Sequence, residues 1–451
     1  IISEPSNFES SEESITEKIE EVSSTIIINN NTVPFSIQTA TINKGGDEIG
    51  SILKDGEVIT PPGFVDAYRL FVEGGWTALD LPEKYGGQAL PLTVQLGFAD
   101  MLNGACLSFS MLPIMQRAAS WLLIEHAKEA LVDKVVPGLA SGEWGATICI
   151  TEPQAGSDVG RLRSKAVMQD DGSYRITGSK IFISYGDHDL TNQIIHMVLA
   201  RTPDSPRGTQ GISLFIVPKY DFDSGKRNGV SVLRLEKKMG LKASPTCALE
   251  FDEAVAYRIG EENRGLQCMF TMVNLMRLEV SIQGPAVASA ALQKALHYAA
   301  ERPQGGHPAE PAIPIIEHAD IRRLLMTMRT RTQAMRALIY ETAFNLDLSR
   351  FAETEEQGLD ARYLAEFLLP VCKACGSETG FDVSNMAIQI FGGHGYVSDA
   401  GVEQHVRDVR VAAVYEGSKG IQAADLVLRK LLKDSGRRYQ LLVKRIDADI
   451  L

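Results

Sequence analysis

The spacing of the apolar residues changes twice along this chain, and these changes limit the folds that it can adopt. Over residues 61–143 the apolar positions recur with the spacing of an amphipathic helix. Over residues 144–257 they alternate with polar positions, a period of two that is typical of strands. Helical spacing returns after Gly265 and continues to about Leu432. This order of helices, antiparallel sheet and helices predicts an α+β fold in which the two classes are segregated.

The N-terminal region differs in composition from the rest of the chain. Residues 1–25 are rich in Ser and Glu and contain few large apolar groups, so we expect a disordered or loosely attached leader. The following part, up to residue 60, contains short β-prone pieces at 25–28 and 39–42. The region has the plan of neither a secretion signal nor a transit peptide, and it lacks an initiating Met, so we expect a trimmed chain or a fragment.

Length and charge exclude several classes of protein. The chain has 451 residues, 44% of them hydrophobic, which is enough to build two or three domains. Its net charge of −12 argues against a surface that follows nucleic-acid phosphates. No apolar run of about 18 residues is present, so we expect no membrane span. Six scattered cysteines suit a reducing compartment, and we expect a cytoplasmic (bacterial) location, with the mitochondrial matrix as the alternative.

Cys372 and Cys375 form a C-x-x-C pattern inside an apolar helical run. A structural zinc site needs a second pair of ligands, and neither another Cys pair nor a His cluster lies nearby in the sequence. We therefore interpret both residues as core cysteines.

Two segments of the strand-rich region suit the binding of a flat polar ring or a phosphate. The segment 149–158 (CITEPQAGSD) joins the end of a strand to a turn rich in small residues and hydroxyl groups. Taken alone, it is equally compatible with an ordinary capped turn. Phe182 and Ser184 end a later strand, although an isolated Phe is more often a core residue than the wall of a cofactor site.

The second helical block contains a candidate base. The glycines of Gly392-Gly393-His394-Gly395 permit close approach of the backbone, and they are also compatible with a plain helix break. Glu416 follows the apolar stretch 411–415 and precedes a small, hydroxyl-bearing turn. Apolar neighbours raise the pKa of a Glu toward neutrality, which a general base requires. The alternative for Glu416 is a simple partner of a helix dipole.

Taken together, and in their order along the chain, these segments resemble the acyl-CoA dehydrogenase family over residues 60–432. The stretch 150–158 is similar to the flavin-loop signature of the family, and Tyr415-Glu416-Gly417-Ser418 is similar to the signature that carries its catalytic base. The stretches 315–325, 403–408 and 420–427 are most similar to the branch that contains 3-methylmercaptopropionyl-CoA dehydrogenase.

The resemblance implies a domain plan and a set of site residues. It implies an N-terminal helical domain (61–143), a middle antiparallel β-domain (144–257) and a C-terminal four-helix bundle (258–434), flanked by an extension (1–60) and a charged tail (435–451). Glu416 is the implied catalytic base. The implied FAD-binding residues are Thr151, Ser157, Phe182, Ser184, Arg302, Gln389, Gly392, Gly393, Ser418 and Gly420. Arg302 is expected to reach the FAD pyrophosphate of a neighbouring subunit. The implied substrate-binding residues are Ser157, Arg277 and Gly417, although Asn274 stands where the family has the acidic companion of Arg277.

The activity that the resemblance implies is the FAD-dependent α,β-dehydrogenation of an acyl-CoA thioester to a trans-2-enoyl-CoA. Glu416 would remove the α-proton, and the β-hydride would pass to flavin N5. The implied partners are an electron-transfer flavoprotein and further copies of this chain in a homodimer or homotetramer. No metal, nucleic acid or membrane is expected. The alternatives are an acyl-CoA oxidase and a non-catalytic, flavin-bearing scaffold.

Overall fold

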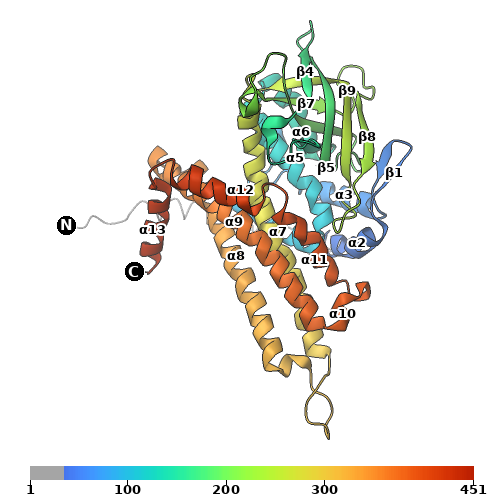
Figure 1. The fold of residues 1–451 in the computed structure, drawn as a ribbon, viewed down its shortest axis with the longest axis vertical. Helices are drawn as coiled ribbons and strands as arrows, with labels where there is room; N and C mark the ends of the chain where they lie inside the picture. Colours follow the sequence, from blue (N-terminus) through green and yellow to red (C-terminus); the bar gives the residue numbers. More distant parts are fainter. Residues whose placement is uncertain (1–34, 451) are drawn as a thin grey trace, which may run out of the picture. The chain divides into compact units, whose positions relative to one another are not determined.

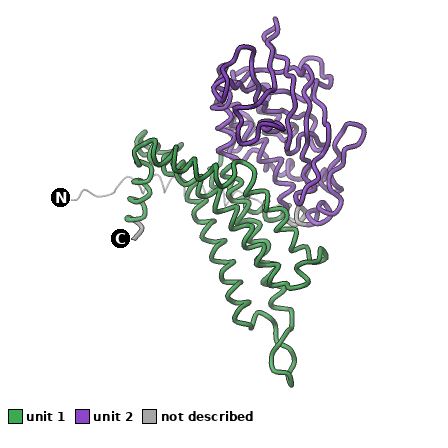
Figure 2. Tube along the Cα trace, in the orientation of Figure 1, with its two compact units in different colours: residues 1–34, 90–105, 277–451 green, residues 35–89, 106–276 purple. Residues whose placement is uncertain are grey.

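The computed structural model describes residues 35–450, which form two compact units (Figure 2). Each unit is assembled from segments that are separate in the sequence. One unit, the sheet unit, contains residues 35–89 and 106–276, and the other, the helical unit, contains residues 90–105 and the chain from Arg277 onward. No helix within the described part of the chain is long and apolar enough to cross a membrane.

A seven-stranded sheet forms the centre of the sheet unit (Figure 1). Its strands follow the order β3-β6-β7-β9-β5-β4, and β8 pairs with β9. Their bounds are β3 Trp144–Cys149, β4 Lys165–Met168, β5 Tyr174–Ser184, β6 Gln193–Ala200, β7 Ser213–Pro218, β8 Val230–Leu235 and β9 Thr246–Ile259. The predicted antiparallel sheet is confirmed, with the exception that β3 and β6 pair in parallel.

β6 and β7 are buried along their whole length, which differs from the predicted alternation of apolar and polar positions. Such burial is expected for central strands that are covered on both faces. Phe215 of β7 and Phe251 of β9 belong to a core that also includes residues of β4, β5 and β8. A hairpin turn at residues 170–173 lies between β4 and β5, and its Gly172 has the positive φ of 83° that favours glycine.

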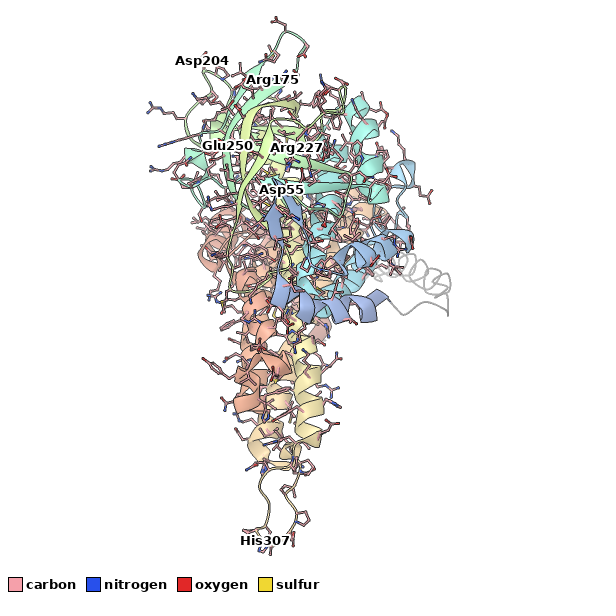
Figure 3. All side chains as sticks on the ribbon, turned by 90° about the vertical axis from the view of Figure 1, so that its right-hand side faces the viewer. Asp55, Arg175, Asp204, Arg227, Glu250 and His307 are labelled. Atoms are coloured by element: carbon pink, nitrogen blue, oxygen red, sulfur yellow. The ribbon has the colours of Figure 1, made fainter. Side chains whose placement is uncertain are left out.

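Helices and a short hairpin complete the sheet unit. The helices are α2 Phe35–Ile49, α3 Phe64–Glu73, α5 Leu107–His126 and α6 Glu129–Ser141, with short 3-10 turns η1 Glu83–Tyr85, η2 Val159–Arg161 and η3 Gly208–Gly211. The hairpin pairs β1 Ile52–Lys54 with β2 Glu57–Ile59, and Asp55 lies at its turn (Figure 3). α5 packs against β3 and α6.

The expectation of β-structure at residues 39–42 is wrong, because this stretch lies inside α2. Local β-propensity is a weak preference that tertiary packing overrides, and α2 packs against α3 and α5. Gly46 of α2 shows how close this packing is, since a Cβ atom there would lie 2.9 Å from the ring of Phe64. The predicted disordered leader, residues 1–25, lies outside the described residues.

Three long helices form the body of the helical unit: the later part of α7 Gly265–Glu301, α8 Ala319–Phe351 and α9 Glu355–Phe391. A broken row of short elements then packs against α9 and takes the place of a fourth helix. It consists of α10 Gly393–Tyr396, η5 Ser398–Ala400, α11 Glu403–Val409, η6 Arg410–Ala413, α12 Lys419–Ala424 and η7 Asp425–Leu431, and the chain continues into α13 Arg437–Ile450. The predicted C-terminal helical domain is confirmed in this form.

The helical unit also includes α4 Leu92–Ala105, which packs against α8. Asp347 of α8 accepts hydrogen bonds from the backbone N–H groups of Leu92 and Thr93, at 2.7 and 2.8 Å, and so caps the first turn of α4. The loop that joins α7 to α8 contains η4 Ile315–Glu317, and His307 lies at its tip (Figure 3).

Candidate active site

The turn after β3 is held by a buried ion pair. Glu152 accepts hydrogen bonds from Lys180 Nζ at 2.8 Å, from Ser164 Oγ at 2.6 Å and from the backbone N–H of Arg163 at 2.6 Å. Burial favours the protonated form of Glu152, but Lys180 and these hydrogen bonds outweigh burial and lower its pKa to about 2. The carboxylate therefore stays ionised and fixes the loop that carries Thr151 and Ser157.

The structure brings Thr151 next to the end of β5. The backbone N–H of Ile181 donates a hydrogen bond of 2.9 Å to the carbonyl oxygen of Thr151, and Phe182 and Ser184 follow Ile181. Thr151 and Ser184 are partly buried, whereas Ser157 is exposed. The four flavin-side residues predicted in the β-domain therefore all belong to the sheet unit, and three of them lie at this strand end.

Phe182 adopts an unusual conformation. It lies at an irregularity in the pairing of β5 with β9, its φ is +60°, and 61% of its side chain is exposed. A left-handed conformation is costly for a bulky residue, and such conformations concentrate at functional sites. An exposed aromatic ring at a strand end offers an apolar face to a planar ligand. Phe182 is therefore not the core residue that its sequence context also allowed.

Glu416 lies in a tight turn between η6 and α12 of the helical unit. Its φ is +53° and that of Gly417 is +92°, so two consecutive residues are left-handed. Gln422 donates hydrogen bonds to both of their carbonyl oxygens, at 3.1 and 3.3 Å, and Lys373 Nζ of α9 donates to the carbonyl oxygen of Gly417 at 2.6 Å. The turn is thus held by side chains from α12 and α9.

The surroundings of Glu416 suit a base. The side chain is partly buried, and no described residue forms an ion pair with its carboxylate within 4 Å. Burial raises the pKa of Glu416 above its ordinary value, while the charges of Arg277 and Lys373 partly oppose the rise. A raised pKa and an uncommitted carboxylate are the properties that a proton acceptor needs near neutral pH.

Arg277 of α7 is buried beside this turn. It pairs with Asp425 of η7 at 3.1 Å, whereas Asn274, at the position of the expected acidic companion, is exposed. Asp425 is therefore an acidic partner of Arg277, although Asn274 stands at the position of the expected one. The structure places Arg277 in the electrostatic environment of Glu416, and a role in binding CoA remains a proposal.

Four predicted cofactor residues lie at another end of the helical unit. Tyr298 of α7 stacks on Phe391 of α9, with 4.1 Å between ring centroids, and this contact brings Arg302 to the same end as Gln389, Gly392 and Gly393. All four residues are exposed. Arg302 is 25 residues from Arg277, just past the end of α7. At 1.5 Å per residue this corresponds to about 37 Å along the helix. One chain therefore presents two separate groups in this unit, one around Glu416 and one around Arg302.

The residues of these groups fit a flavin nucleotide. A Cβ atom at Gly156, Gly392, Gly393 or Gly420 would meet nothing within 4 Å, so a ligand can approach the backbone there. Ser418, the N-cap of α12, is exposed and makes no capping hydrogen bond. In the helical unit the exposed Arg302 guanidinium suits a pyrophosphate, and in the sheet unit the exposed Phe182 ring suits one face of a flat heterocycle.

Sequence reasoning missed Lys373, Asp425 and Gln422, which surround the Glu416 turn. A signal for Lys373 was present, because it is a lone charged residue in the apolar run that contains Cys372. Cys372 is buried, as predicted, but the prediction that Cys375 is a core residue is wrong, because the side chain of Cys375 is exposed. Within residues 35–450 no group of His, Cys, Asp and Glu side chains could hold a metal ion.

Comparisons with known proteins give a consistent result. The models of the acyl-CoA dehydrogenase N-terminal, middle and C-terminal domains match residues 57–143, 147–254 and 263–431. The chain is 42% identical to 3-methylmercaptopropionyl-CoA dehydrogenase of Ruegeria pomeroyi over 91% of its own length and 71% of that protein. It is 36% identical to the broad-specificity linear acyl-CoA dehydrogenase FadE5 of Mycobacterium tuberculosis over 85% of its own length and 65% of that protein.

The fold also has solved counterparts. The structure of Caenorhabditis elegans ACDH-11 in complex with C11-CoA matches with a TM-score of 0.80 and 23% sequence identity, over 98% of this chain and 73% of that one. At this level of identity the similarity concerns the fold alone.

Proposed function

Because this chain belongs to the acyl-CoA dehydrogenase family, we propose that it is an FAD-dependent enzyme that dehydrogenates the Cα–Cβ bond of an acyl-CoA thioester. The product is a trans-2-enoyl-CoA. FAD would supply the acceptor for the β-hydride. The residues of this chain would bind and orient both ligands and remove the α-proton.

The main support for this proposal is the placement of Glu416. Its carboxylate is partly buried, its pKa is raised by burial, and no described residue forms an ion pair with it. A carboxylate that only stabilised the fold would be paired or capped, as Glu152 and Asp347 are. The left-handed φ of Glu416 is a further cost that a purely structural turn has no need to bear.

The enzyme has to increase the acidity of the α-C–H bond as well as accept the proton that this bond releases. An unactivated α-C–H is far too weak an acid for a carboxylate near neutral pH, so the thioester carbonyl must be polarised. We assign the backbone N–H of Glu416 to this carbonyl oxygen, as one donor of an oxyanion hole. Each such donor contributes about 3 kcal/mol to transition-state stabilisation. Glu416 then acts through its backbone on the oxygen and through its side chain on the α-proton.

We assign the remaining site residues by their positions. Thr151, Phe182 and Ser184 would line the flavin ring, and Ser157, which is exposed, would contact the cofactor or the neighbouring acyl-CoA. Ser418 and Gly420 would follow the cofactor from the Glu416 turn, and Gly417 would contact the substrate. Arg302, Gln389, Gly392 and Gly393 would bind the FAD of a neighbouring copy, because Arg302 lies about 37 Å along α7 from the Glu416 group. A homodimer or homotetramer follows from this assignment.

The Glu416→Gln variant tests the proposal. The amide has the shape of the carboxylate but cannot accept the α-proton, so the variant should keep its yellow cofactor and lose at least about a hundredfold in the rate of flavin reduction by an acyl-CoA under anaerobic conditions. Glu378→Gln is the matched control, because Glu378 forms a partly exposed ion pair with Lys419 on the adjacent helix. Near-normal reduction in Glu416→Gln would remove Glu416 from this role.

Two further measurements define the reaction. A panel of acyl-CoAs, each tested for anaerobic bleaching of the flavin, would identify the acyl group. Reoxidation of the bleached enzyme by an electron-transfer flavoprotein, without peroxide release in air, would support a dehydrogenase. Rapid peroxide release would instead make the enzyme an oxidase.

A further inference from the structure

Lys373 is a buried charge that the assignments above leave without a role. It lies in the middle of α9, and its side chain is 0% exposed. Its Nζ atom donates a hydrogen bond of 2.6 Å to the carbonyl oxygen of Gly417. No described carboxylate lies within ion-pair distance of it, whereas the other fully buried lysine, Lys180, is paired with Glu152. A buried ammonium group without a direct ion pair is costly, so its presence calls for an explanation.

Glu416 provides the negative charge that acts on Lys373, because the neighbouring carboxylate of Asp425 is already paired with Arg277. Arg277 of α7 is already matched by Asp425 of η7, which also lies 3.6 Å from Arg429. The carboxylate of Glu416 acts on the ammonium group from the turn between η6 and α12. Burial lowers the pKa of Lys373 to about 8, Arg277 contributes to the fall, and Glu416 opposes it.

Lys373 also helps to hold the backbone conformation of the turn that contains Glu416. Glu416 and Gly417 are both left-handed, and a left-handed non-glycine residue persists only where its surroundings hold it. Lys373 and Gln422 are the two side chains that bond to the carbonyl oxygens of this turn. Gln422 supplies hydrogen bonds only, whereas Lys373 supplies a hydrogen bond and a positive charge.

We propose that Lys373 is a positioning residue for Glu416. Its hydrogen bond to Gly417 fixes the left-handed turn, and its charge keeps the neighbouring carboxyl group ionised and ready to accept a proton. This inference rests on the proposed function of Glu416 as the base. It adds a specific partner on α9 that sets the charge state of that base.

The test separates the charge of Lys373 from its hydrogen bond. Lys373→Met removes the charge and keeps a flexible apolar side chain of similar length. Lys373→Arg keeps the charge with a different shape. Gln422→Leu is the matched control, because it removes the other hydrogen bonds to the same two carbonyl oxygens and changes no charge.

The first readout is the protonation of Glu416 in the FAD-loaded protein without substrate. The infrared band of its carboxylic acid, identified by its loss in Glu416→Gln, is followed against pH. Lys373→Met should raise the apparent pKa of Glu416 by at least about one pH unit, and the pH profile of flavin reduction should move with it. Lys373→Arg should restore the native profile for the most part, and Gln422→Leu should leave the pKa in place. An unchanged pKa in Lys373→Met, or an equal shift in Gln422→Leu, would overturn the proposal.

The second readout applies even if Lys373→Met does not fold. Glu416→Gln removes the counter-charge of Lys373, so the folded-state pKa of Lys373 should fall further below its unfolded value. The unfolded state then binds more protons than the folded state over a wider range, and stability rises with pH across that range. The thermal midpoint of Glu416→Gln should therefore already rise with pH below about 8, where that of the native protein is flatter. Identical slopes would show that the two side chains are not coupled.

This design distinguishes the inference from the proposed function. If Glu416 is not the base, Glu416→Gln reduces its flavin normally, but the infrared titration still reports whether Lys373 sets the pKa of Glu416. If Glu416 is the base and Lys373 has no part in its ionisation, flavin reduction fails in Glu416→Gln while the titration of Lys373→Met matches that of the native protein.

Discussion

The guanidinium group of Arg277 is bound to the carboxylate of Asp425, with 3.1 Å between Nη1 and Oδ2, and both side chains are buried. This ion pair joins α7 to the first residue of η7. It neutralises a positive charge that would otherwise act on Glu416 at full strength, because Arg277 lowers the pKa of that group. The pair therefore contributes both to the packing of the helical unit and to the electrostatics of the candidate base.

Asp425→Asn should weaken the fold and shift the pH profile. Removing one partner of a buried ion pair costs about 3 to 5 kcal/mol in the free energy of unfolding. With residue 425 neutral, the charge of Arg277 should also lower the pKa of Glu416 further, so the acidic limb of flavin reduction should move to lower pH. Urea unfolding and the pH profile measure the two effects. Asp382→Asn is the control, because Asp382 pairs with Arg331 at 3.0 Å on the surface and should cost less than about 1 kcal/mol.

Three buried histidines should make the protein sensitive to mild acid. Burial lowers the pKa of His188, His196 and His405 from 6.5 to about 3. Each is therefore neutral in the folded state while the unfolded state takes up a proton, so the stability that each neutral histidine contributes is present above pH 6.5 and is lost as the pH falls toward about 3. The loss is about 1.4 kcal/mol per pH unit for each histidine.

The thermal midpoint should accordingly fall as the pH is lowered below 6.5. His405→Gln should reduce the slope, since glutamine does not titrate. His307→Gln, on the exposed loop between α7 and α8, is the control and should leave the slope unchanged. A flat midpoint between pH 6.5 and about 4 would contradict the assigned neutrality of these side chains.

The order of the elements could be predicted from the sequence because the hydrophobic period differs so strongly between the blocks. The period of two over residues 144–257 predicts the strands of the sheet. The parallel pairing of β3 with β6 could not be predicted, because strand alternation carries no information on which strands become neighbours. The helix at residues 35–49 was missed because its packing on α3 and α5, and not its local propensity, decides its conformation.

The candidate site was only partly predictable. Glu416 and Phe182 could be selected by their context and by resemblance, but their left-handed conformations could not, since both residue types disfavour positive φ. The partners of Glu416 come from α7, α9 and α12, at positions far from it in the chain, and charge pairs such as Arg277 with Asp425 form only on folding. Asn274 alone suggested that Arg277 had lost its partner, whereas the tertiary structure supplies another.

Phe182→Gly should separate stability from cofactor binding. The side chain is 61% exposed and its φ is +60°, so glycine relieves strain while it increases the entropy of the unfolded chain. The free energy of unfolding should change by less than about 1 kcal/mol. Retention of FAD during gel filtration, read from visible absorbance, should fall markedly because an apolar wall of the site is lost. Phe251→Ala, at a buried position, should show the reverse pattern, with a loss of about 3 to 5 kcal/mol. Full FAD retention in Phe182→Gly would place the flavin elsewhere.

A mixed oligomer of two inactive variants tests whether the site is shared between chains. Arg302 and Arg277 are separated by about 37 Å along α7, so the Arg302 of one chain should serve the FAD beside the Glu416 of another. Arg302→Ala alone should lose FAD, and Glu416→Gln alone should keep FAD but lose flavin reduction.

When the two variants are co-expressed with different affinity tags and the mixed species is isolated, one kind of site combines the intact Glu416 of one chain with the intact Arg302 of the other. The mixed oligomer should therefore regain substrate-driven flavin reduction at a fraction of its sites, well above the level of either homo-oligomer. If each site were built within one chain, every site would carry one of the two defects, and mixing would restore nothing. Equal activity in the mixed and unmixed species would thus assign Arg302 to its own subunit.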